Sequence, residues 1–105
     1  MTTEELEELL VAGAEGPRLD YKGPCKWHVN FFAKDILAMA NMEDVSSIVI
    51  GMAEDGNDYK RVGLNEEELA SFKYDDMRDQ FSKFAQPMVD FTVAFPTDKG
   101  GLKYA

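Results

Sequence analysis

The chain has 105 residues and a formal net charge of −9, from 20 acidic residues against 11 Lys and Arg. Its length predicts one domain, and 45% hydrophobic with 30% charged residues is ordinary for a globular protein. One Cys excludes an internal disulfide, and one Cys with one His cannot build a zinc site, so a metal would need carboxylate ligands. No apolar run approaches the ~20 residues of a membrane span and no secretion signal opens the chain, so we expect a cytoplasmic protein.

The positive charges are concentrated in one segment. Residues 16–34 hold four cations against one acid, a local charge of +3, which leaves −12 for the remainder of the chain. Binding to a phosphate backbone requires clustered Lys and Arg, which the chain as a whole lacks and this segment has.

The first half of the chain predicts a helix, a strand and a second helix. Thr2 and Glu5 form a capping box that opens a helix over 2–12, with Leu residues at helical spacing. Period-two alternation over 18–22 predicts a short strand. Asn30 then caps a helix with one apolar face.

A buried strand and a hairpin are predicted next. VSSIVIGMA (45–53) is almost free of charge, as in a central strand covered on both faces. EDGND is a turn signal, so 59–63 should pair back as the second arm of a hairpin. Asn65 with Glu68 then starts a helical region that a break near Ser71 divides.

The last part of the chain predicts two more strands. In residues 88–95, Val or Phe occupies every second position, alternating with Met88, Asp90, Thr92 and Ala94, and LKYA (102–105) begins a strand that stops after four residues. The predicted order is α-β-α-β-β-α-β-β. It indicates a single α+β domain over 1–105, with about three helices on a mainly antiparallel or mixed sheet. Because the final strand is so short, we expect this domain to be part of a longer protein or to be completed by a partner.

The ordered motifs of the chain resemble a known family. They are Glu15 with the triplet Asp20-Tyr21-Lys22, a helix ending in ILAMANM (36–42), the strand IVIGMAEDG (48–56), and VGL (62–64). This set is similar to the Schlafen-type AlbA-like domain, which is also described as DNA-binding and, historically, as a divergent AAA family. The resemblance covers essentially the whole chain, although MEDVSS (42–47) stands where the family has a Gly-Gly pair.

The resemblance implies association with nucleic acid, typically in a bacterial or phage regulator of transcription. In the Schlafen branch it implies metal-dependent cleavage of RNA by three acidic residues. Matched by position, these fall on Glu15, Asp20 and either Glu54 or Asp55, with Glu15, Asp20 and Glu54 as the implied metal ligands. The implied cofactor of such a nuclease is Mg²⁺ or Mn²⁺, and otherwise no cofactor is expected.

The residue types are compatible with a nuclease site and also with a purely structural role. Asp20 and Lys22 lie two apart on a predicted strand and therefore share a face, where an acid can hold a metal while a Lys stabilises developing charge. The plain alternative is a surface ion pair, and Glu54 and Asp55 are also ordinary turn residues. A shared metal site requires strand 18–22 to lie beside strand 45–53.

A nucleic-acid-binding role for segment 18–34 depends on cations interleaved with Trp27, Phe31 and Phe32. Cations hold phosphates while aromatic rings stack on bases. We expect binding to DNA or RNA that weakens steeply with salt. In the alternative interpretation Phe32 is a core residue and the Lys residues only solvate the start of a helix. His28 is expected to be structural or a minor contact, and Cys25 to play no role. The residues predicted to bind nucleic acid are Arg18, Lys22, Lys26, Trp27 and Lys34.

A third alternative is a protein-interaction or assembly domain. An unfinished strand at 102–105 would offer an open edge to a second copy or a partner protein. The net charge would then serve solubility and charge complementarity.

Overall fold

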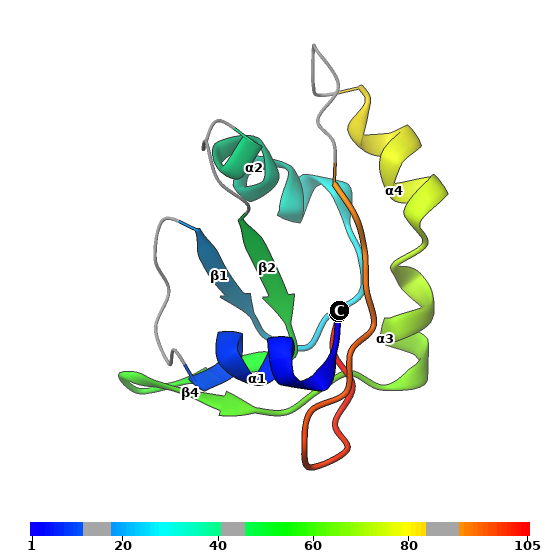
Figure 1. Cartoon of the computed structure of the whole chain (residues 1–105). Helices are drawn as coiled ribbons and strands as arrows, with labels where there is room; N and C mark the ends of the chain where they lie inside the picture. Colours follow the sequence, from blue (N-terminus) through cyan, green and yellow to red (C-terminus); the bar gives the residue numbers. More distant parts are fainter. Residues whose placement is uncertain (12–17, 41–45, 84–90) are drawn as a thin grey trace.

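The computed structural model describes residues 1–11, 18–40, 46–83 and 91–105 (Figure 1). The predicted α+β class is confirmed: in these residues helices combine with two separate two-stranded sheets. The elements are, in chain order, α1 (Thr3–Val11), β1 (Leu19–Lys22), α2 (Val29–Ala40), β2 (Ser47–Ile50), β3 (Met52–Asp55), β4 (Asp58–Arg61), α3 (Glu66–Ser71) and α4 (Tyr74–Phe81).

β1 and β2 lie side by side as a parallel pair. Leu19 is opposite Ser47, and Lys22 is opposite Ile50. The neighbourhood that the candidate site requires, strand 18–22 beside strand 45–53, is therefore confirmed. Parallel strands need a crossover connection, which α2 supplies.

The prediction of one central strand over 45–53 is wrong at Gly51. This residue has a φ of +127°, which separates β2 from β3 and turns the chain into a second sheet. A Cβ at position 51 would lie 2.6 Å from the ring of Tyr104. Only glycine allows the bend and the close approach of that ring.

The predicted hairpin is confirmed, and so are the helix starts at Thr2 and Asn65. The cap predicted at Asn30 is wrong, because α2 begins at Val29, with the His28 carbonyl accepting from the N–H groups of Phe31 and Phe32, and Asn30 lies inside the helix. β3 and β4 pair antiparallel from Met52 opposite Arg61 to Asp55 opposite Asp58. Thr2 with Glu5 and Asn65 with Glu68 exchange the side-chain-to-backbone hydrogen bonds of capping boxes. No helix among the described residues is both long and apolar enough to span a membrane.

The predicted strands at the end of the chain are not formed in the described residues. Residues 91–96 have no ladder; Thr97 and Lys103 form an isolated bridge across the predicted turn. The alternation of 91–95 has another cause: Phe91 and Val93 are half-buried against the helical side of the core, while Phe95 is 51% exposed. Residues 88–90 of this prediction lie outside the described residues. The observed order is therefore α-β-α-β-β-β-α-α.

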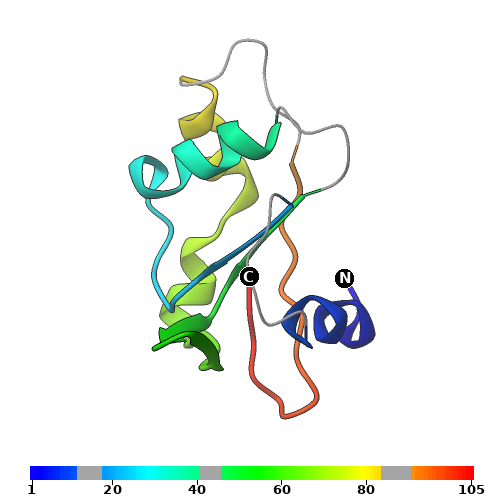
Figure 2. The same ribbon diagram turned by 90° about the vertical axis from the view of Figure 1, so that its left-hand side faces the viewer.

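Figure 2 shows α1 on one side of the β1–β2 pair and α2 on the other, and each side has its own apolar cluster. On the α1 side are Leu6, Leu10, Tyr21, Val49, Met52 and Tyr104, and on the side of α2, α3 and α4 are Phe32, Ile50, Phe72 and Met77. Since side chains alternate along a strand, Asp20 and Lys22 point to the side opposite Tyr21, toward α2.

Candidate functional site

Lys22 is the centre of an ionic cluster between β1 and α2. Its ammonium lies 3.2 Å from Asp20 Oδ2 and 2.8 Å from Asp35 Oδ2, and its side chain is only 13% exposed. Burial by itself would lower the pKa of Lys22, but the hydrogen bonds to Asp35 and Asp20 outweigh it, so its pKa is raised and the group stays charged. Lys22 is therefore neutralised inside the protein and does not supply a free positive charge.

The same ammonium lies against two aromatic rings. Lys22 Nζ is 4.7 Å from the centroid of Phe31 and 5.8 Å from that of Phe32. The two rings differ in exposure: Phe32 is 1% exposed and belongs to the core, whereas Phe31 is 56% exposed. A cation–π contact thus supports one face of an aromatic ring that projects into solvent.

A shallow concavity lies beside Phe31, where the loop after β1 leads into α2. It has a volume of about 550 Å³ and is lined by Cys25, Lys26, His28, Asn30 and Phe31. Lys26 and its ion-pair partner Glu67, 3.6 Å away, have side chains 60% and 80% exposed, so this contact is weak and leaves the Lys accessible. Burial raises the pKa of the Cys25 thiol, which keeps it protonated and unreactive at neutral pH.

Trp27 belongs to the core more than to the surface. Its ring stacks on Phe32 at 5.0 Å between centroids. Its indole N–H donates to Gln80 Oε1 at 2.8 Å, and its backbone N–H donates to Ser71 Oγ at 2.8 Å. Trp27 therefore anchors the loop that carries the concavity to α3 and α4.

The two remaining predicted cations lie in different places. Lys34 is exposed on α2, three residues after Phe31, so the two side chains are neighbours on the helix surface. Arg18 is exposed just before β1 and lies about 13 Å along the strand from Lys22. Besides the neutralised Lys22, the predicted cations near Phe31 are therefore Lys26 and Lys34, whereas Arg18 is at the other end of β1.

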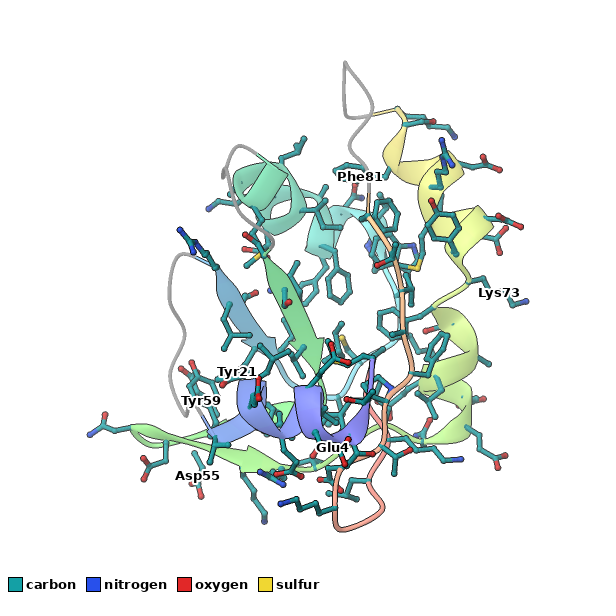
Figure 3. All side chains as sticks on the ribbon, in the orientation of Figure 1. Glu4, Tyr21, Asp55, Tyr59, Lys73 and Phe81 are labelled. Carbon is teal, nitrogen blue, oxygen red and sulfur yellow. The ribbon has the colours of Figure 1, made fainter. Side chains whose placement is uncertain are left out.

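The predicted carboxylates are only partly brought together. Asp20 is in contact with Lys22, and Glu54 and Asp55 are exposed on the hairpin, where Figure 3 shows Asp55 far from α2. In the described part of the chain no three His, Cys, Asp or Glu side chains are grouped so that they could hold a metal ion. A metal ion bound to Asp20 would compete with the Lys22 ammonium for the same carboxylate. Asp20, Glu54 and Asp55, as the structure places them, therefore do not fit a site for Mg²⁺ or Mn²⁺. Glu15 lies outside the described residues, so the three-carboxylate site stays a prediction.

A second ionic cluster joins α1, β4 and the turn near the end of the chain. The Arg61 guanidinium donates to both oxygens of Glu7, at 2.8 and 2.9 Å, and lies 3.7 Å from Asp98 Oδ2. The Tyr104 hydroxyl donates to the same Asp98 oxygen at 2.9 Å. The Arg61 hydrogen bonds and the backbone N–H of Lys99 lower the pKa of Glu7 to about 2. These residues hold elements together and border no cavity described here.

Sequence reasoning missed Asp35 as a partner of Lys22 and gave His28 and Asn30 no place at a surface site. Asp35 is one of many acids on the chain, and only the packing of α2 on β1 brings it to Lys22. No protein-family model matches the chain, and no curated protein or solved structure matches it either. The resemblance to the Schlafen-type AlbA-like domain therefore stays an expectation from the motifs.

Proposed function

We propose that the chain binds nucleic acid through the α2-start surface, formed by Lys26, His28, Asn30, Phe31 and Lys34. The observation that carries the proposal is the exposed ring of Phe31, which lines a concavity together with the accessible Lys26 and has the exposed Lys34 three residues further along α2. An aromatic ring flanked by cations is the combination that binds bases and phosphates together. The motif resemblance supports the same class of ligand.

The charges of this surface predict weak binding with a shallow salt dependence. Lys22 is neutralised by Asp20 and Asp35, so Lys26 and Lys34 are the cations left near Phe31. Two phosphate contacts on a single strand give a slope of log K against log salt of about −1.4. The steep dependence expected from the summed charge of segment 16–34 is therefore replaced by a shallow one.

The proposal is tested by titrating fluorescently labelled single-stranded DNA, duplex DNA and RNA with the full chain at low salt, with anisotropy as the readout. We expect Lys26→Ala and Lys34→Ala each to weaken binding. Lys60→Ala is the matched control, because Lys60 is an exposed Lys on β4 in the other sheet. Absence of binding to all three nucleic acids would contradict the proposal, and so would an equal loss with Lys60→Ala.

A second candidate function is assembly through strand addition at β2. The N–H of Ile50 donates to the C=O of Ala105 at 2.9 Å, and the N–H of Ala105 donates back at 3.3 Å. Since alternate residues of β2 point to β1, the N–H and C=O of Ile48 point to the same edge as Ile50. β2 has no charged residue or Pro of the kind that protects sheet edges.

We propose, as this second candidate, that a further polypeptide strand pairs with Ile48 beside Ala105. Size-exclusion chromatography with light scattering tests the case of a second copy. A dimer whose proportion rises with concentration would support it, and a strict monomer at high concentration would remove it.

A further inference from the structure

We infer that the α2-start surface selects single-stranded nucleic acid, with one unpaired base stacked on the exposed face of Phe31 over the adjoining concavity. The inference rests on the proposed function and adds the structural class of the ligand.

The surroundings of the Phe31 ring favour stacking of a base on it. One face of the ring is covered by the Lys22 ammonium at 4.7 Å, and Phe32 contacts the ring at 86° with centroids 5.2 Å apart. Asp20 and Asp35 hold that ammonium in place. The ring is therefore supported from within the protein, while 56% of Phe31 remains exposed. A ring that is supported by these contacts and is still more than half exposed can serve as a stacking platform that loses less side-chain entropy on binding than an unsupported ring.

The concavity beside Phe31 has the size and lining to receive a base. Its volume of about 550 Å³ falls within the range of ligand pockets, roughly 300–1,000 Å³. Its lining is mostly apolar, which suits contact with the face of a base, and His28 and Asn30 at its border are residues that can donate and accept hydrogen bonds. Lys26 at the same concavity can contact the phosphate of the stacked nucleotide.

The α2-start surface lacks the features that would bind a duplex. The bases of a duplex are stacked on one another, so none of them presents a face to Phe31. A duplex would depend on phosphate contacts alone, and the α2-start surface provides two accessible Lys residues within a chain of net charge −9. A ligand that cannot place a base on Phe31, such as a duplex or an abasic strand, should therefore bind the chain only weakly.

The experiment compares three labelled oligonucleotides of one sequence: a single strand, its duplex, and a single strand with abasic sites. We expect the wild-type chain to bind the intact single strand at least tenfold more tightly than the other two. Phe31→Ala should weaken single-strand binding by roughly 5- to 150-fold, the effect of losing one stacked base. Phe31→Tyr should keep most of the affinity because it keeps the ring.

Phe95→Ala is the matched control, since Phe95 is 51% exposed in the segment before the last turn. Circular dichroism melts confirm that each variant is folded. Duplex binding as tight as single-strand binding, or equal effects of Phe31→Ala and Phe95→Ala, would overturn the inference. If the duplex bound as tightly as the single strand and Lys26→Ala weakened the binding of both, the inference would fall while the proposed function stood. If no oligonucleotide bound, both would fall.

Discussion

The ammonium of Lys22 lies 2.8 Å from the carboxylate of Asp35, which ties the last residue of β1 to the second turn of α2. This contact fixes α2 relative to the parallel strand pair. Because of this contact, Lys22 is paired within the protein and is not available for the phosphate contact predicted for it. Its ammonium lies against the Phe31 ring instead.

Removal of the Asp35 charge should weaken this connection. We expect Asp35→Asn to lower the free energy of unfolding by about 1 kcal/mol, because Asp20 remains as a partner and the Asp35 side chain is 36% exposed. Urea denaturation followed by circular dichroism measures the change. Glu54→Gln on the exposed hairpin is the control and should be near neutral; an equal loss with the control would contradict a specific role for Asp35.

Glu7 should make stability depend on acid pH. Its pKa is lowered in the folded state from 4.5 to about 2, so its contribution is fully present above about pH 4.5 and is lost as the pH falls toward 2. The urea midpoint of the wild type should therefore fall through this window more than that of Glu7→Gln. Glu66→Gln, at an exposed position in the first turn of α3, serves as the control and should follow the wild type. Parallel curves for wild type and Glu7→Gln would refute this assignment.

Gly51→Ala should be strongly destabilising. The substitution combines a φ of +127° with a Cβ placed 2.6 Å from the Tyr104 ring, and Tyr104 is fully buried. We expect a loss of about 3 kcal/mol in the free energy of unfolding. Gly23→Ala, where a Cβ meets nothing within 4 Å, should change stability little. A thermal melt of both variants distinguishes the two positions, and similar melting temperatures would show that the Gly51 bend is not required.

The nuclease alternative has a direct test in an RNA cleavage assay with Mg²⁺ or Mn²⁺. If the predicted carboxylates form the site, cleavage should require the metal and disappear in Asp20→Asn, and Glu54→Gln against Asp55→Asn should identify the third acid. A melt of Asp20→Asn is needed alongside, because this substitution also changes the contact with Lys22. Metal-dependent cleavage that survives Asp20→Asn would exclude the proposed set.

Local patterns predicted local structure well. The capping boxes at Thr2 and Asn65, the hairpin around Gly56 and the break after Ser71 all depend on residues a few positions apart, and all are present. The predicted proximity of β1 and β2 is also present, since both segments have the residue pattern of strands that pair.

The failures have causes distant in the sequence. β2 ends at Gly51 because the ring of Tyr104 occupies the space beside it. The alternation of 91–95 reflects packing of Phe91 on Tyr74 and Phe81 instead of a hydrogen-bonded ladder. Trp27 is an anchor because Ser71 and Gln80, more than forty residues later, accept its hydrogen bonds. None of these partners can be chosen from spacing alone.

The pairing of Ala105 with Ile50 and the burial of Tyr104 have a consequence for biosynthesis. A nascent chain whose last translated residue precedes position 104 lacks the ring that fills the cluster shared by α1, β1 and β2. Both residues must therefore have left the ribosomal exit tunnel before the domain can reach its described form.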